Sequence, residues 1–147
     1  MESISVHWNI YSSDGIDIDS SNDILITSTR IEAHDDCISI KSGRDEDGRR
    51  VGRPSENILI ENCHFAYGHG GVAMGSEISG DIRNVTIRSC LMDNENWSPL
   101  RFKASPAVAE LWKISLLKIL SSKEHAVSLI SIWNGVWFLR FYLHIIH

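Results

Sequence analysis

Acidic and imidazole side chains stand at the start of several short apolar strands in the sequence. Asp35 and Asp36 are adjacent and directly precede the alternating run CISIK at 37–41, Asp14 opens DGIDIDS, and His69 opens HGGVAMGS. Carboxyl groups held close together repel each other, and this repulsion separates their pKa values, so that one stays protonated while another stays ionised. A set of this kind suits general acid and general base catalysis on a glycosidic bond.

The strands behind these residues recur along the chain. Their apolar pairs are Ile16/Ile18, Ile38/Ile40, Val72/Met74 and Leu100/Phe102, separated by 22, 34 and 28 residues. A second strand series begins at Asn22, Asn57 and Asn84, with spacings of 35 and 27 residues. Two strand series that advance nearly in step, with little helical patterning between them, predict an all-β fold, a parallel β-helix of about four coils. A β-sandwich is the alternative, but the short hairpin signals that it needs are missing.

Superposing the apolar pairs brings polar residues of different coils together. Asp14 aligns with Asp36, and Asp35 aligns with both Ser13 and His69. Strict alternation would turn Asp14 and Asp36 into the core, which is unfavourable for charges, so we expect the chain to bend just before the strand. The sequence therefore predicts that three carboxylates and one imidazole converge.

The same superposition defines the outer face of these strands. The outward positions form one row of Asp17, Ser39, Ala73 and Arg101 and a second row of Asp19, Lys41, Gly75 and Lys103. Because neighbouring strands of a sheet lie about 4.8 Å apart, residues of neighbouring coils can touch one ligand. The sequence predicts the floor of a groove with a cationic end at Arg101 and Lys103.

Composition limits the partners and cofactors. The formal net charge of −5 argues against nucleic acid as a partner. Cys37, Cys63 and Cys90 are an odd number of cysteines without CxxC spacing, which favours buried thiols over a disulfide framework or a zinc site. His34 lies beside the acidic pair but has no second ligand cluster at a fixed spacing, so we expect no metal and no cofactor. The start of the chain lacks the basic segment and apolar run of a signal peptide.

Four ordered blocks resemble the signature of glycoside hydrolase family 28, the polygalacturonases and related pectin hydrolases. The blocks are SDGIDIDSS, HDDCISIKSGRDEDGRRVGRPSENI, GHGGVAMGSE and RFK, and the resemblance covers roughly residues 6–103. Where the family usually has N-T-D-G and R-I-K, this chain has Ser12-Ser13-Asp14-Gly15 and Arg101-Phe102-Lys103, which keeps the ionic groups. The long segment KSGRDEDGRRVGRPSENI is more similar to the exo-acting and bacterial branch than to the fungal endo-enzymes.

The resemblance implies a right-handed parallel β-helix that hydrolyses α-1,4-galacturonosidic bonds of polygalacturonan with inversion. By resemblance, Asp35 is the general acid, and Asp14 and Asp36 activate the attacking water. His69 supports the protonation state of the acid. The family needs no metal for this chemistry.

The resemblance also implies the substrate and the location. Arg101 and Lys103 would bind the carboxylate of a galacturonate unit, so the expected partner is an acidic polysaccharide, with no nucleic acid, no membrane and a monomeric protein. A rhamnogalacturonan or xylogalacturonan hydrolase is the alternative enzyme, and an inactive β-helix that only binds carbohydrate is the alternative outside enzymes. Because pectin is extracellular, we expect the full-length family member to be extracellular or periplasmic.

The character of the sequence changes at Ala104. We expect residues 1–103 to form a partial β-helix catalytic region and 104–147 an atypical tail, in a truncated copy of a longer family member. The leucines at 111, 116, 117 and 120 are compatible with a helical apolar stripe, and 126–138 resembles a membrane segment until Asn134 and Arg140 interrupt it. In a third interpretation, the tail is translated from the wrong reading frame. With one choice of codons, the segment PAVAELWKIS reads GRGGAVENI in the neighbouring frame. That sequence has a glycine turn followed by the start of a further strand of the second series.

Overall fold

The three-dimensional structure is a computed structural model. It describes residues 2–5, 11–93, 98–103, 114–120, 130–133 and 136–139, and it describes side chains for 11–93 and 98–103. Most of these residues lie in short strands joined by tight turns, as the two strand series predict.

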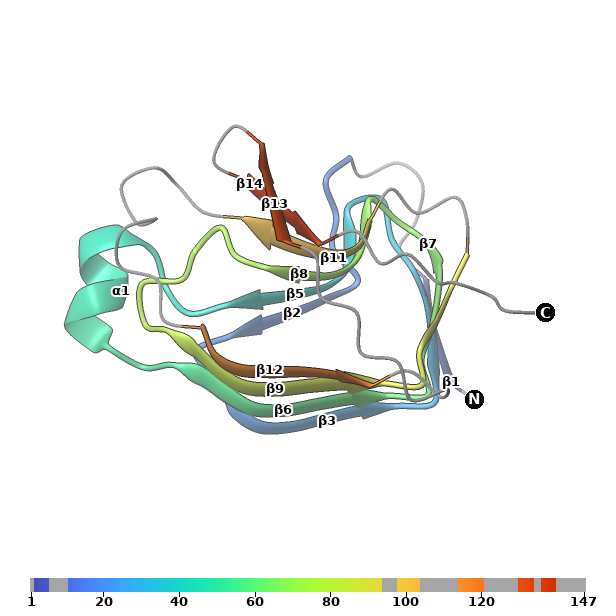
Figure 1. Cartoon of the computed structure of the whole chain (residues 1–147), viewed down its shortest axis with the longest axis horizontal. Helices are drawn as coiled ribbons and strands as arrows, with labels where there is room; N and C mark the ends of the chain where they lie inside the picture. Colours follow the sequence, from blue (N-terminus) through green and yellow to red (C-terminus); the bar gives the residue numbers. More distant parts are fainter. Residues whose placement is uncertain are drawn as a thin grey trace.

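Parallel strands stack into three sheets (Figure 1). The site sheet contains β2 (Ile16–Asp19), β5 (Asp36–Lys41), β8 (Gly70–Met74) and β11 (Ser98–Lys103). The opposite sheet contains β3 (Asn22–Thr27), β6 (Ser55–Glu61), β9 (Ile82–Arg88) and β12 (Ile114–Leu120). The end sheet contains β1 (Glu2–Ser5), β4 (Thr29–Glu32), β7 (His64–Tyr67) and β10 (Leu91–Met92). Coils run β2 to β4, β5 to β7 and β8 to β10, and another begins at β11, which confirms a parallel β-helix of about four coils.

The register predicted for the site sheet is confirmed. Ile38 pairs with Ile16 on one side and with Val72 on the other, and Val72 pairs with Leu100. Each coil therefore places an apolar side chain over the one before it, and Ile38 and Val72 are no more than 1% exposed. The alternate positions face outward in the predicted row of Asp17, Ser39, Ala73 and Arg101.

The core lies between the three sheets. Ile38 from the site sheet, Ile58 from the opposite sheet and Phe65 from the end sheet belong to one buried cluster. Truncating one such side chain to alanine costs roughly 2–5 kcal/mol. Cys37 and Cys63 are buried free thiols, which confirms the prediction for these two cysteines.

An outward ladder of polar side chains runs along the opposite sheet, but its first member differs from the prediction. Asn22 pairs with Glu56, so the neighbouring Asp23 takes the place expected for Asn22. Asn57 donates to Asp23 at 2.9 Å, and Asn84 donates to Asn57 at 2.7 Å. All three ladder residues have positive φ angles, between 48° and 57°, which Asn and Asp tolerate better than most residues.

The helical interpretation of the tail is wrong for the part that the structure describes. β12 is a strand parallel to β9, and Ile114, Leu117 and Ile119 share register positions with the buried Ile82, Val85 and Ile87. Backbone groups at the edge of β9 need partners, and pairing with them outweighs a helical stripe of leucines. β13 (Ile130–Trp133) and β14 (Val136–Leu139) pair antiparallel, and β14 pairs with the edge of β11. Leu111 lies outside the described residues, and the boundary at 103 and the frame of the tail stay predictions.

A short helix, α1 (Asp45–Val51), interrupts the second coil between β5 and β6. Acidic residues occupy its first turn and basic residues its last, in agreement with the helix dipole. Gly52 ends it with a left-handed conformation at φ 59°. Within the described part of the chain, no helix has the length and apolar character needed to cross a membrane.

Candidate active site

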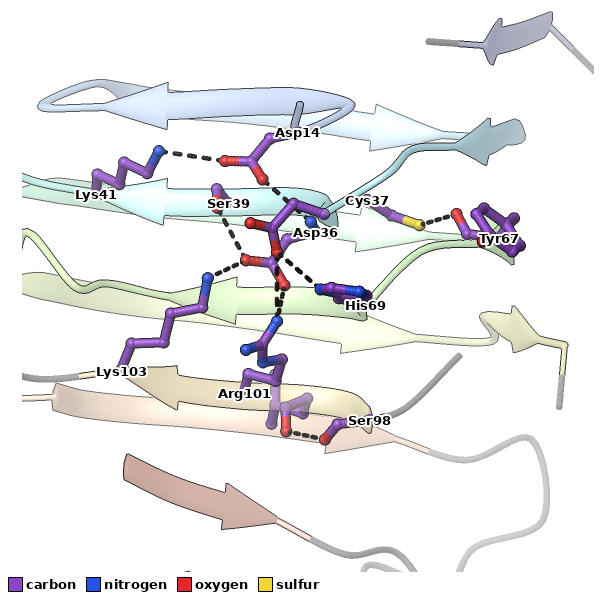
Figure 2. Close-up of polar contacts among 12 residues, drawn as sticks. Asp14, Asp36, Cys37, Ser39, Lys41, Tyr67, His69, Ser98, Arg101 and Lys103 are labelled. Atoms are coloured by element: carbon purple, nitrogen blue, oxygen red, sulfur yellow. Dashed lines mark hydrogen bonds and ion pairs between the residues drawn. The ribbon is translucent and has the colours of Figure 1, made fainter. Parts of the chain in front are cut away.

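The carboxylates meet where the strands of the site sheet begin. The amide of Asp35 donates to the carbonyl of Ser13 at 3.0 Å, and the amide of His69 donates to the carbonyl of Asp35 at 2.7 Å. One oxygen from each of Asp14, Asp35 and Asp36 lies within 4.8 Å of the other two. The predicted convergence of three carboxylates is confirmed, and His69 lies beside them with Nδ1 3.8 Å from Asp35 Oδ1 (Figure 2).

A break in side-chain alternation turns Asp36 to the outer face. Cys37 and Ile38 are consecutive, yet both belong to the core and both are 0% exposed. Asp36 instead accepts a hydrogen bond from the outward Ser39 at 3.5 Å, so the predicted bend is confirmed. Burial, together with the negative charge of Asp36, raises the pKa of the Cys37 thiol to about 12, so this thiol stays neutral in the core.

Asp36 is the most enclosed of the three carboxylates, with 0% exposure. Arg101 Nη1 donates to its Oδ1 at 2.8 Å, and Lys103 Nζ donates to its Oδ2. A buried carboxylate needs such partners, because an unpaired charge away from water is costly. Gly70 permits this approach, since a Cβ there would lie 2.5 Å from Asp36 Oδ1 and 2.7 Å from Arg101 Cδ. Asp36 therefore anchors both cations of the predicted row.

Asp14 is held by a backbone amide and by Lys41. Its Oδ1 accepts from the amide of Asp36 at 3.0 Å, and its Oδ2 lies 3.2 Å from Lys41 Nζ. Burial alone would raise the pKa of Asp14, but the hydrogen bonds from Asp36, Lys41 and Ser39 and the charge of Lys41 together lower it below its ordinary value of 3.8. Asp14 is therefore ionised at neutral pH.

Asp35 has looser contacts than the other two carboxylates. Its Oδ1 lies 3.5 Å from Arg101 Nη1 and 3.8 Å from His69 Nδ1, and its side chain is 27% exposed. The His69 side chain is 53% exposed. Asp35 is thus the carboxyl that solvent and a ligand reach most easily.

Lys41 has a part in the site that the sequence did not reveal. The alternation of β5 places it in the outward row, but not beside a particular carboxylate. In the structure Lys41 Nζ bridges Asp14 Oδ2 and Asp17 Oδ1, the latter at 2.6 Å. The signal available beforehand was the position of Asp17 one coil earlier, diagonal to Lys41 on the same face.

The carboxylate oxygens form a donor set that a hard cation could use. Cationic side chains already engage them, because Arg101 and Lys103 contact Asp36 and Lys41 contacts Asp14. Amino and guanidinium groups thus balance the negative charge that a metal would otherwise balance. The arrangement fits acid and base chemistry better than metal coordination.

The stacked sheets and their acidic face define a parallel β-helix protein with a carboxylate site beside paired cations. The family profile described as glycosyl hydrolases family 28 matches residues 4–123. The chain belongs to this family, as its sequence blocks predict.

Individual relatives agree with the family match. The chain is 29% identical over 101 residues to an exo-poly-alpha-D-galacturonosidase of Dickeya chrysanthemi, which covers 69% of this chain and 16% of that protein. It is 36% identical over 92 residues to a probable polygalacturonase of Vitis vinifera, covering 61% and 18% of the two chains. The crystal structure of a hyperthermoactive exopolygalacturonase from Thermotoga maritima is similar with a TM-score of 0.51 and 28% identity, covering 72% of this chain and 31% of that one. The matched region therefore spans less than a fifth of the length of the Dickeya and Vitis proteins.

Proposed function

We propose that the chain hydrolyses α-1,4-galacturonosidic bonds of polygalacturonan by general acid and general base catalysis. The observation that carries the proposal is the cluster of Asp14, Asp35 and Asp36 beside Arg101 and Lys103 on one face of the β-helix. Relatives of the chain are named polygalacturonase, exopolygalacturonase and exo-poly-alpha-D-galacturonosidase, which supports galacturonan as substrate and an exo-type mode.

Asp35 is proposed as the general acid and Asp14 as the general base. An acid that protonates the leaving oxygen must reach the substrate, and Asp35 is the loosely held, partly exposed carboxyl, with His69 in position to support its protonation. A base must be ionised, and the hydrogen bonds to Asp14 favour its charged form. Asp36, expected to activate water with Asp14, is 0% exposed and holds a cation on each oxygen, whereas the Asp14 side chain is 13% exposed, which supports a positioning role for Asp36.

The two cations are proposed to bind the carboxylate of a galacturonate unit. Arg101 carries five N–H donors in a planar fork, and its contacts with Asp35 and Asp36 use Nη1. Asp36 holds the guanidinium of Arg101 and the ammonium of Lys103 in place before substrate arrives. This favours a uronate in the cleavage subsite over the neutral sugars of a rhamnogalacturonan.

Hydrolysis is proposed to invert the anomeric carbon. The nearest carboxylate oxygens lie within 4.8 Å, less than the roughly 6.5–9.5 Å between the carboxyl groups of typical inverting enzymes, and this spacing alone favours retention. We nevertheless propose inversion from the family resemblance, with a water molecule activated by Asp14 as the nucleophile in place of a carboxylate. Proton NMR during the first turnovers should show the β-anomer from the α-linked polymer; an initial α-anomer would establish retention.

The purified protein and its Asp35→Asn variant test the acid. We expect the variant to release reducing sugar from polygalacturonate about 10²–10⁴-fold more slowly, because an amide cannot donate the proton. Asp47→Asn on the exposed helix α1 is the matched control and should keep the activity of the parent. Equal activity of Asp35→Asn and the parent would remove Asp35 from the acid role.

The substrate also suggests where the full-length protein works. Galacturonan is a wall polymer outside the plant cell, so we propose an extracellular or periplasmic location and action as a monomer. Fractionation of the source cells followed by assay of polygalacturonate hydrolysis in each fraction tests the location.

A further inference from the structure

Three rings lie near the turns that lead into the strands of the site sheet: Tyr11 precedes β2, His34 precedes β5, and Tyr67 ends β7, just before β8. Tyr11 lies three residues before Asp14, His34 immediately precedes Asp35, and Tyr67 lies two residues before His69. The ring centroids of Tyr11 and His34 are 6.4 Å apart, and those of His34 and Tyr67 are 6.1 Å apart. The rings therefore form a row that follows the axis of the β-helix. The row lies near the start of the strands of the site sheet, where the carboxylates also lie.

Tyr11 is the outermost ring of this row. It is 89% exposed, the highest value among the large apolar side chains whose exposure the structure describes. A ring with that exposure contributes little to the core, so burial does not explain its position. The tilted contact with His34, at 56°, and the edge-on contact between His34 and Tyr67, at 83°, are favourable aromatic geometries.

The acidic groups around the row are already paired with cations. Asp14 and Asp35 follow Tyr11 and His34 in the sequence, Lys41 pairs with Asp14, and Arg101 Nη1 lies 3.5 Å from Asp35 as well as contacting Asp36. A polyuronate that crosses this face meets Arg101 and Lys103 for one of its carboxylates, whereas the cation beside Asp14 is Lys41, which is shared between Asp14 and Asp17. The exposed ring face of Tyr11 offers a contact there that does not require a further cationic group.

We propose that Tyr11, supported by His34 and Tyr67, is a sugar-binding subsite that packs against another pyranose ring of the polymer whose carboxylate is held by Arg101 and Lys103. Axial C–H groups of the sugar contact the apolar ring face, and the phenolic hydroxyl is available to the sugar hydroxyls. The inference rests on the proposed function for the identity of the sugar as a uronate. It differs from the acid and base roles because Tyr11 contributes to binding and not to proton transfer.

Tyr11→Ala tests the subsite by separating binding from turnover. We expect KM for oligogalacturonates to rise about tenfold while kcat stays within about twofold, because the ring contact is lost and the carboxylates are unchanged. Tyr11→Phe keeps the ring and should restore KM to within about twofold of the parent. Leu25→Ala, at a 59% exposed position on the opposite sheet, is the matched control and should leave both constants unchanged.

A direct measurement of binding tests the Tyr11 subsite without relying on hydrolysis. Titration calorimetry with trigalacturonate in the Asp35→Asn background should show about tenfold weaker binding when Tyr11→Ala is added, and circular dichroism checks that each variant is folded. Unchanged affinity in the folded double variant would overturn the subsite, even if hydrolysis by the parent supports the proposed function. Conversely, a Tyr11-dependent affinity in a protein that does not hydrolyse the polymer would keep the subsite and remove the catalytic proposal.

Discussion

Lys41 is the residue through which the charge of Asp14 can be tested. Its ammonium group contacts Asp14 and Asp17, and Asp35 and Asp36 are the other charged groups beside Asp14. Partial burial alone would lower the pKa of Lys41, but the contacts with Asp17 and Asp14 raise it, so Lys41 is positively charged over the whole range in which Asp14 titrates. The protonation of Asp14 is therefore coupled to a fixed positive charge.

Lys41→Met should move the acidic limb of the kcat/KM profile to higher pH. Removing the positive charge raises the pKa of Asp14, and the base is then protonated at a higher pH than in the parent. We expect a shift of about one pH unit, at the lower end of what one neighbouring charge does. Lys41→Arg keeps the charge and should keep the limb near its original position. An unmoved limb in the methionine variant would mean that Asp14 does not limit activity at low pH.

The local chemistry of the site was only partly predictable from the residues. The cost of burying a carboxylate predicts the bend before β5, and the structure confirms it at Cys37. Alternation assigns a side chain to a face, but it does not say which oxygen a flexible side chain reaches. The pairing of Lys103 with Asp36 and of Lys41 with Asp14 depends on side-chain torsions, so it required three-dimensional coordinates.

At the level of the strands, apolar side chains set the register of the site sheet. Ile38 and Val72 each stack on a similar side chain one coil away, and a shift by one residue would turn them to solvent. The polar ladder on the opposite sheet was harder to align. Asn22 and Asp23 are both suitable ladder residues by type, and only the left-handed backbone at Asp23 selects between them.

Asn57→Ala should destabilise the stacked coils at the centre of the ladder. Asn57 has φ 56° and makes side-chain hydrogen bonds to both neighbouring ladder residues. Alanine is strained in this conformation and makes neither bond, so we expect a loss of about 1–3 kcal/mol in the free energy of unfolding. Urea unfolding followed by circular dichroism measures it.

Asn22→Ala is the natural control for the ladder, because Asn22 is adjacent to the ladder and lies outside it. Its side chain contacts only the neighbouring Asp23 among the hydrogen bonds of the described residues, at 3.0 Å. A change of less than about 0.5 kcal/mol is expected at such a surface position. Equal losses in the two variants would show that the ladder hydrogen bonds contribute little to stability.

At the scale of the whole molecule, the site depends on residues from all four coils. Asp14 belongs to the first coil, Asp35 and Asp36 to the entry of the second, His69 to the third and Arg101 to the fourth. Each coil contacts mainly its neighbours, so the site is only as rigid as the stack. The position of the last coil, and of the two cations on β11, therefore depends on what covers the edges of β9 and β11.

Removing residues 104–147 should destabilise the stack and promote association. In the structure β12 pairs with β9 and β14 pairs with β11, so the deletion leaves the backbone groups of two strand edges without these partners. Exposed strand edges bind other chains, and we expect the 1–103 protein to elute as larger species in size-exclusion chromatography and to unfold at a lower urea concentration than the 147-residue protein.

A variant with Lys118→Pro tests one edge alone, because proline removes a backbone N–H from β12 and should give an intermediate effect. If the 1–103 protein is monomeric and as stable as the parent, the tail strands do not protect these edges, and residues 1–103 form an independent folding unit.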